Sequence, residues 1–191
     1  RRWNHGGIHY VIDPYRSFKA ADARKENAAL DDTAACDKRL TKGGDKQCRH
    51  SQPYFDSVFN STRARLQLAF PSRVSFLRNF SVEAAAVTPN ASLAFIYIDA
   101  RHDYAGVRED LTMWWPKLCP GGIISGHDWT WWEHYRRRNA GAPPPVAQKY
   151  GDTVAQAVRE LSLAEPATGR AVYVTADHPA SWFIFRHPAP C

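Results

Sequence analysis

The sequence predicts a doubly wound α/β fold whose mostly parallel sheet ends in an antiparallel hairpin. Short runs rich in β-branched and aromatic residues alternate with longer stretches of helical periodicity. The run 93–98 (LAFIYI) is almost continuously apolar, which is typical of a strand buried on both faces of a helix-covered parallel sheet. Two closing runs, 171–175 and 182–185, are joined by a short turn and predict the hairpin.

Four strands are predicted ahead of the hairpin. The first, 8–12 (IHYVI), ends at Asp13-Pro14, because the residue before a proline disfavours helical geometry and Asp-Pro favours a turn. The Pro120-Gly121-Gly122 run is expected to turn the chain into the fourth strand. The other three strands are 73–80, 93–98 and 123–125.

Four helices are predicted between these strands. Pro53 suits the first turn of a helix over 53–70. A short helix around 83–86 ends before Pro89, and Asp103 and Asp152 can cap two later helices. The apolar stripe of the first helix is Phe55, Phe59, Thr62, Leu66 and Phe70.

Residues 16–52 interrupt the alternation of strands and helices. This polar segment contains Gly43-Gly44 and is predicted to be an insertion with one short helix near 20–35. The whole chain, 1–191, is expected to form a single domain, because its length suits one and 44% of its residues are hydrophobic.

Composition excludes two function classes. No apolar run approaches the ~20 residues that cross a bilayer, so we expect no membrane insertion. Lys and Arg total 25 against 19 Asp and Glu, but the basic residues are scattered and accompany no nucleic-acid-binding motif. We therefore expect no nucleic-acid partner. Four cysteines without a CxxC pair do not predict a structural zinc site.

Several features bear on the cellular compartment. The chain begins with Arg1 and lacks a charged-then-apolar leader, so no targeting signal is predicted and the sequence is expected to be part of a longer protein. Asn60, Asn79 and Asn90 begin sequons, which mark a secretory glycoprotein or arise by chance, and the sequence leaves both interpretations open. In an oxidising compartment, Cys36 and Cys48 could form a disulfide.

Polar residues follow the predicted strands at their carboxyl ends, where ligands bind in α/β sheets. Asp13 there suits the hydroxyls of a ribose, or else caps a turn. Carboxylates and imidazoles at the ends of neighbouring strands could bind a divalent cation or form an acid–base pair. Alternatively, they could cap a helix or form hydrogen bonds with the backbone. The groups that follow the later strands are Asn79 to Ser81, Asp99 to His102, and His127-Asp128.

Some enzyme classes lack their motifs in this sequence. It contains no Gly-x-Ser-x-Gly nucleophile elbow and no GxxxxGK[ST] phosphate loop. A loop over 129–150 is rich in Trp, Arg and Pro, and it either holds a planar or anionic substrate or covers the edge of the sheet.

The segment 95–129 resembles a class I S-adenosylmethionine-dependent methyltransferase. Its order of motifs is Ile-Asp-x-x-His-x-Tyr, Asp-Leu, Leu-x-Pro-Gly-Gly and His-Asp. A weaker likeness extends over residues 8 to 187 and leaves the insertion out. The resemblance implies a Rossmann-like sheet with strand order 3-2-1-4-5-7-6. The residues that match the motifs are Asp99, His102, Tyr104, Asp110-Leu111, Leu118, Pro120-Gly121-Gly122 and His127-Asp128.

The resemblance implies roles for several residues. Asp13 would bind the donor's ribose, and Asn79, Phe80 and Ser81 would lie near its adenine. Asp99 would face the reacting methyl group, and His102 would be the general base that removes the acceptor's proton. A divalent cation such as Mg²⁺ would be held by Asp99, His127 and Asp128.

The resemblance also implies a first strand and a glycine-rich loop ahead of Asp13, where this sequence has only twelve residues. The chain is then a fragment, or another copy or partner chain completes the sheet, or the donor site has been lost. The leading hypothesis is O-methylation of a small molecule or sugar. The alternatives are a non-catalytic methyltransferase-like binding or structural subunit and another metal-dependent enzyme on the same fold.

Overall fold

The computed structural model describes residues 7–16, 50–101, 104–129, 153–169, 171–177 and 180–187. The chain divides into two compact units, Arg1–Ala84 and Ala85–Cys191, and each unit has its own sheet. Most of the predicted insertion and nearly all of the Trp-rich loop lie outside the described residues, as do Cys36 and Cys48. The predicted single domain stays a prediction.

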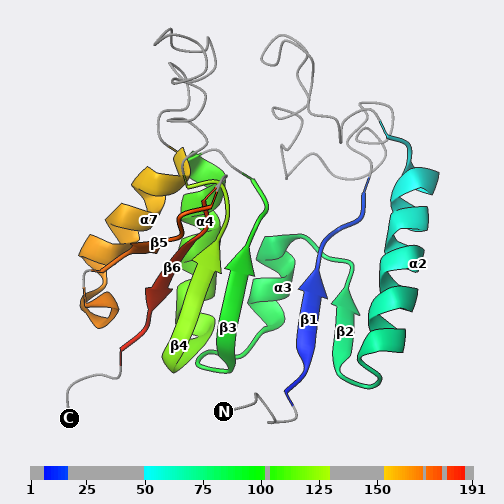
Figure 1. Cartoon of the computed structure of the whole chain (residues 1–191), viewed down its shortest axis with the longest axis horizontal. Coiled ribbons are helices and arrows are strands. Elements are labelled where there is room, and N and C mark those ends of the chain that lie inside the picture. Colours follow the sequence, from blue (N-terminus) through cyan, green and yellow to red (C-terminus); the bar gives the residue numbers. More distant parts are fainter. Residues whose placement is uncertain are drawn as a thin grey trace, which may run out of the picture. The chain divides into compact units, whose positions relative to one another are not determined.

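The described residues of the first unit include two parallel strands and a long helix (Figure 1). β1 (His9–Ile12) pairs with β2 (Val74–Leu77), and Ile12 lies opposite Leu77. α2 (Gln52–Ala69) has a proline in its first turn, as predicted. Four residues of its predicted stripe are half-buried, whereas Phe70 is 49% exposed at the end of the helix. α3 (Ser81–Val87) follows β2.

The second unit contains a four-stranded mixed sheet with the order β3-β4-β6-β5. The strands are β3 (Leu93–Ile98), β4 (Leu118–Gly126), β5 (Tyr173–Val174) and β6 (Trp182–Phe185). β3 and β4 are parallel, whereas β6 is antiparallel to both β4 and β5. The predicted C-terminal hairpin is therefore confirmed.

Two helices cover one face of this sheet (Figure 1). α4 (Tyr104–Trp114) and α7 (Thr153–Ala164) pack against each other, and short 3₁₀ helices follow them at Trp115–Lys117 and Pro166–Thr168. Ile96, Ile124 and Ile184 are register partners and are buried. Leu111 of α4 and Val158 of α7 are also buried and belong to the same core.

Two details of the predicted strands are wrong. The run 93–98 is not buried on both faces, because Phe95 is 52% exposed and Tyr97 50% exposed. Their side chains point to the face opposite Ile96, which α4 and α7 do not cover. The Pro120-Gly121-Gly122 run does not turn into a new strand but lies within β4, where Gly121 at φ +82° accompanies a shift in register with β3.

Within each sheet, the strand order is the one that the methyltransferase resemblance implies. β2 and β1 correspond to its strands 3 and 2, and β3, β4, β6 and β5 correspond to 4, 5, 7 and 6. Among the described residues, no strand corresponds to strand 1 of that order. Within the same ranges, none of the helices combines the length and the apolar character needed to cross a bilayer.

Gly126, the last residue of β4, lies where a side chain would not fit. A Cβ atom there would be 2.4 Å from the carbonyl oxygen of Ile98 and 2.7 Å from the ring of Trp182. The backbone of β3 and a fully buried indole therefore approach this position from two directions. Glycine is required here for close packing rather than for an unusual φ.

Replacing Gly126 with alanine should therefore lower the free energy of unfolding by about 1–3 kcal/mol, the usual cost of overpacking a core. Urea unfolding of the wild type and of Gly126→Ala measures this difference. An unchanged midpoint would contradict the close approach of Ile98 and Trp182.

Candidate functional site

Three polar residues meet at the carboxyl ends of β3 and β4. Asp99 follows β3, and His127 and Asp128 follow β4. One ligand atom from each residue lies within 4.8 Å of those of the other two. Asp99 is exposed, whereas His127 and Asp128 are half-buried. The predicted meeting of these side chains from neighbouring strands is found in the structure.

The pairing of β3 with β4 brings these residues together. Ile98 and Gly126 are the last residues of the two strands and lie opposite each other. The residues that follow them, Asp99 and His127, are therefore also adjacent. The backbone N–H of His127 donates to the carbonyl oxygen of Ile98 at 3.3 Å and extends the pairing by one residue. Asp99 and His127 therefore leave the sheet side by side.

The turn at Asp128 is stabilised by contacts that neighbouring segments make with the next residue, Trp129. Asp128 has φ +59°, in the left-handed region that aspartate tolerates better than most residues. The backbone N–H of Trp129 donates to the carbonyl oxygen of Ala180 at 3.0 Å, and the Arg159 guanidinium lies 5.0 Å from the Trp129 ring. These contacts from α7 and from the segment before β6 hold the strained turn in place.

The three side chains form a ligand set that suits a divalent cation. His127 Nδ1 lies 3.3 Å from Asp128 Oδ1, close to the ~3.0 Å between adjacent ligands around an octahedral ion with bonds of ~2.1 Å. The limit of 4.8 Å for the whole group slightly exceeds the ~4.2 Å between opposite ligands of such an ion. Small side-chain rotations would therefore bring all three onto one cation.

Two other polar motif residues, Tyr104 and Asp110, lie in α4. The Tyr104 hydroxyl donates to Glu160 Oε2 of α7, and this hydrogen bond raises the pKa of Tyr104 and lowers the pKa of Glu160. Tyr104 thus links the two helices that cover the sheet. Asp110 is buried in the same helix. His102, the predicted general base, lies outside the described residues.

A second polar group lies at the carboxyl ends of β1 and β2 in the first unit. Asp13 follows β1, and its backbone N–H donates to the carbonyl oxygen of Leu77 at 3.2 Å. The stretch 79–81 begins two residues after Leu77, so parallel pairing places it at the same edge as Asp13. Glu83 Oε2 in the first turn of α3 accepts the backbone N–H of Phe80 at 2.9 Å, as in a capping box.

The Asp13 carboxyl group has opposing electrostatic influences. Burial raises its pKa most strongly, because the ionised form loses hydration. The backbone N–H of Tyr15 donates to Asp13 Oδ1 at 2.5 Å and, together with the charge of Arg78, lowers the pKa. The balance leaves the pKa above its usual value of 3.8.

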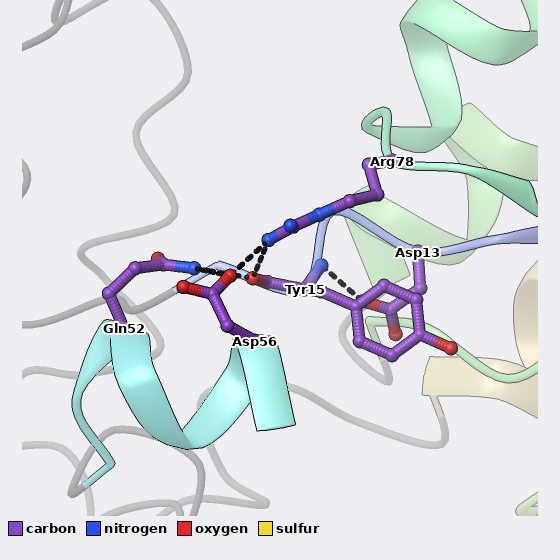
Figure 2. A network of polar contacts seen from close by, with 5 residues as sticks. All are labelled: Asp13, Tyr15, Gln52, Asp56 and Arg78. Carbon is purple, nitrogen blue, oxygen red and sulfur yellow. Dashed lines mark hydrogen bonds and ion pairs between the residues drawn. The ribbon is translucent and has the colours of Figure 1, made fainter. Parts of the chain in front are cut away.

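Sequence reasoning missed the network of polar contacts behind Asp13. Figure 2 shows Arg78 and Gln52 converging on Asp56 and on the carbonyl group of Tyr15. No sequence motif marks these residues, because Asp56 and Arg78 are 22 positions apart and meet only when α2 lies beside β2.

The two polar groups belong to different units. Asp13 and residues 79–81 lie in the first unit, whereas Asp99, His127 and Asp128 lie in the second. The prediction that both groups line one site stays a prediction.

Comparison with known families identifies the chain. The family described as "Methyltransferase domain" matches residues 4–129, which is more than half of the chain. No curated protein matches the chain.

Solved structures with this fold include three with low sequence identity. A protein from Corynebacterium glutamicum is 14% identical with a TM-score of 0.54, and the match covers 71% of this chain and 58% of that protein. The O-methyltransferase NovP is 17% identical with a TM-score of 0.52, and the match covers 95% of this chain and 60% of NovP.

The third structure is a Staphylococcus aureus protein assigned as a caffeoyl-CoA O-methyltransferase. It is 13% identical with a TM-score of 0.51, and the match covers 69% of this chain and 60% of that protein. The chain thus spans about three fifths of the length of each of the three proteins. It belongs to the methyltransferase domain family and has the Rossmann-like fold of class I methyltransferases.

Proposed function

We propose that this chain takes part in S-adenosylmethionine-dependent methyl transfer to a hydroxyl oxygen of a small molecule or sugar. The proposal rests on the family match over residues 4–129. The polar groups at the carboxyl ends of both parallel strand pairs support it, because ligands bind at these ends in α/β sheets. The O-methyltransferase names of two proteins of similar fold favour oxygen as the acceptor atom.

The residues of the first unit would hold the donor. Asp13 would offer a carboxylate oxygen to the two ribose hydroxyls. Residues 79–81 follow β2 at the same edge and would lie near the adenine. Bound S-adenosylmethionine supplies an activated methyl group, so alignment with the acceptor does most of the catalytic work.

The residues of the second unit would act on the acceptor. Asp99, His127 and Asp128 would hold a divalent cation, which lowers the pKa of a hydroxyl group bound to it. Asp99 would also face the reacting methyl group. As the acceptor oxygen attacks the methyl carbon, the bond from that carbon to the donor's sulfur would break and S-adenosylhomocysteine would leave. His102, three residues after Asp99, would accept the proton that the acceptor hydroxyl loses.

The proposed activity can be tested with methyl-labelled S-adenosylmethionine and three acceptor classes: catechols, simple phenols and sugars. Labelled product in one class is expected, together with saturable binding of the donor. Donor binding without transfer to any class would favour a non-catalytic methyltransferase-like subunit. A folded chain that does not bind the donor would overturn the proposal.

The metal site predicts a specific change on removal of one carboxylate. Asp128→Asn should weaken Mn²⁺ or Mg²⁺ binding by at least about tenfold, because an amide is a weaker ligand than a carboxylate. Calorimetric titration measures the affinity. Glu109→Gln is the matched control, since it removes one charge from an exposed position on α4. Equal affinities for all three proteins would exclude Asp128 as a ligand.

The proposed base predicts a separation between catalysis and donor binding. His102→Gln should lower kcat by about 10²–10⁴, the usual contribution of a general base, with little change in the donor Kd. His9→Gln, at an exposed position on β1, is the matched control. If the donor Kd rises and kcat is unchanged at saturation, His102 is a binding residue instead.

A further inference from the structure

The turn after β1, residues 13–15, is supported by side chains from two other elements. Gln52 Nε2 of α2 and Arg78 Nη2, just beyond β2, donate to the carbonyl oxygen of Tyr15 at 3.0 and 3.1 Å. Figure 2 shows that the same two side chains also point toward Asp56. Asp56 Oδ1 accepts from Arg78 at 2.8 Å and from Gln52 at 3.0 Å. One carboxylate thus orients both donors.

This support acts on a backbone conformation that aromatic residues seldom adopt. Tyr15 has φ +44°, in the left-handed region where its Cβ is crowded. Its side chain is buried, and its ring lies edge-on to Phe59 of α2 with centroids 5.1 Å apart. The Arg78 guanidinium lies 4.8 Å from the same Phe59 ring. Packing and hydrogen bonds from α2 and Arg78 therefore hold Tyr15 in a strained state.

The strained turn determines the orientation of the Asp13 carboxylate. Because Tyr15 is held by its carbonyl oxygen and by its ring, its backbone N–H stays within reach of Asp13 Oδ1, to which it donates at 2.5 Å. A charge-assisted hydrogen bond of this kind fixes the rotation of the carboxylate. Oδ2 is then held in one direction as an acceptor for a ligand hydroxyl.

We propose that Arg78, with Asp56 and Gln52, is a positioning residue that aims the Asp13 carboxylate at the vicinal diol of the donor's ribose. The inference rests on the proposed function, in which Asp13 binds the ribose. It adds that the recognition of the diol depends on three residues that do not touch the ligand.

A role in overall stability explains the network less well. The side chains of Arg78 and Asp56 are 39% and 45% exposed, and an ion pair this accessible to water contributes little to the free energy of unfolding. The unusual backbone of Tyr15 and the oriented Asp13 carboxylate are the features that depend on the network.

Arg78 also affects the ionisation of Asp13. Its positive charge opposes the effect of burial on the Asp13 pKa, so removing the charge should raise that pKa further. Among the described residues, the elements around this turn also carry Asp56 on α2, Glu83 on α3 and Arg16, whose guanidinium lies 5.9 Å from the Phe80 ring. Loss of Arg78 would leave the Asp56 charge unbalanced and add to the rise.

The test compares two ligands, S-adenosylhomocysteine and its 2′,3′-dideoxy analogue, which differ only in the diol. The wild type should prefer the diol by about ten- to hundredfold, as expected for hydrogen bonds to a charged group. Arg78→Ala should lose most of this preference while binding the dideoxy analogue as the wild type does. Arg65→Ala is the matched control. It removes an arginine from an exposed position on α2 and should keep the preference.

The pH dependence supplies a second measurement. Binding of the diol requires ionised Asp13, so it is complete above the Asp13 pKa and is lost as the pH falls through it. In Arg78→Ala this loss should occur at higher pH than in the wild type. Arg78→Lys keeps the charge but cannot reproduce the planar fork, so it should keep the pH profile of the wild type and recover the preference only in part.

The possible outcomes separate this inference from the proposed function. If the wild type binds neither ligand, the proposed function fails and this inference fails with it. If the wild type prefers the diol and Arg78→Ala prefers it equally, only the inference is overturned. An equal loss of affinity for both ligands in Arg78→Ala also overturns it, and urea unfolding shows whether that loss reflects unfolding.

Discussion

Register between parallel strands is the constraint on which both polar groups depend. Parallel pairing places the carboxyl ends of two strands at one edge, and the register decides which residues emerge there together. In the second unit, the pairing of Ile98 with Gly126 brings Asp99 beside His127. In the first, the pairing of Ile12 with Leu77 brings Asp13 to the level at which β2 ends. A register shift of two residues would separate either group by about 7 Å.

The close approach at Gly126 shows how tightly the second register is held. The Ile98 carbonyl and the Trp182 ring fill the space that a Cβ would need, and β6 continues the packing through Ile184. The position of His127 and Asp128 therefore depends on the buried core as well as on backbone hydrogen bonds. Trp182, a core residue on β6, therefore helps to determine where the side chains of His127 and Asp128 lie.

In both polar groups, the turn after one of the strands contains a non-glycine residue with positive φ. Tyr15 has φ +44° and Asp128 has φ +59°. Each turn is secured from neighbouring elements, the first by Gln52 and Arg78 and the second by the contacts of Trp129 with Ala180 and Arg159. Strain that is stabilised from outside is common where side chains must be held in one direction for a ligand. The feature recurs at both strand pairs for which we propose a ligand-binding role, although Ser72 and Ala91 also have positive φ.

The sequence by itself determined the order of strands and helices, the C-terminal hairpin and the polar residues at strand ends, because periodicity and turn residues are local signals. Asp99 and His127-Asp128 could be predicted to meet, since both follow strongly apolar runs. Only the tertiary structure decided the exposure of Phe95 and Tyr97, because burial depends on which face the helices cover. It also decided the bulge at Gly121 and the meeting of Arg78 with Asp56, since both depend on how segments distant in sequence pack against each other.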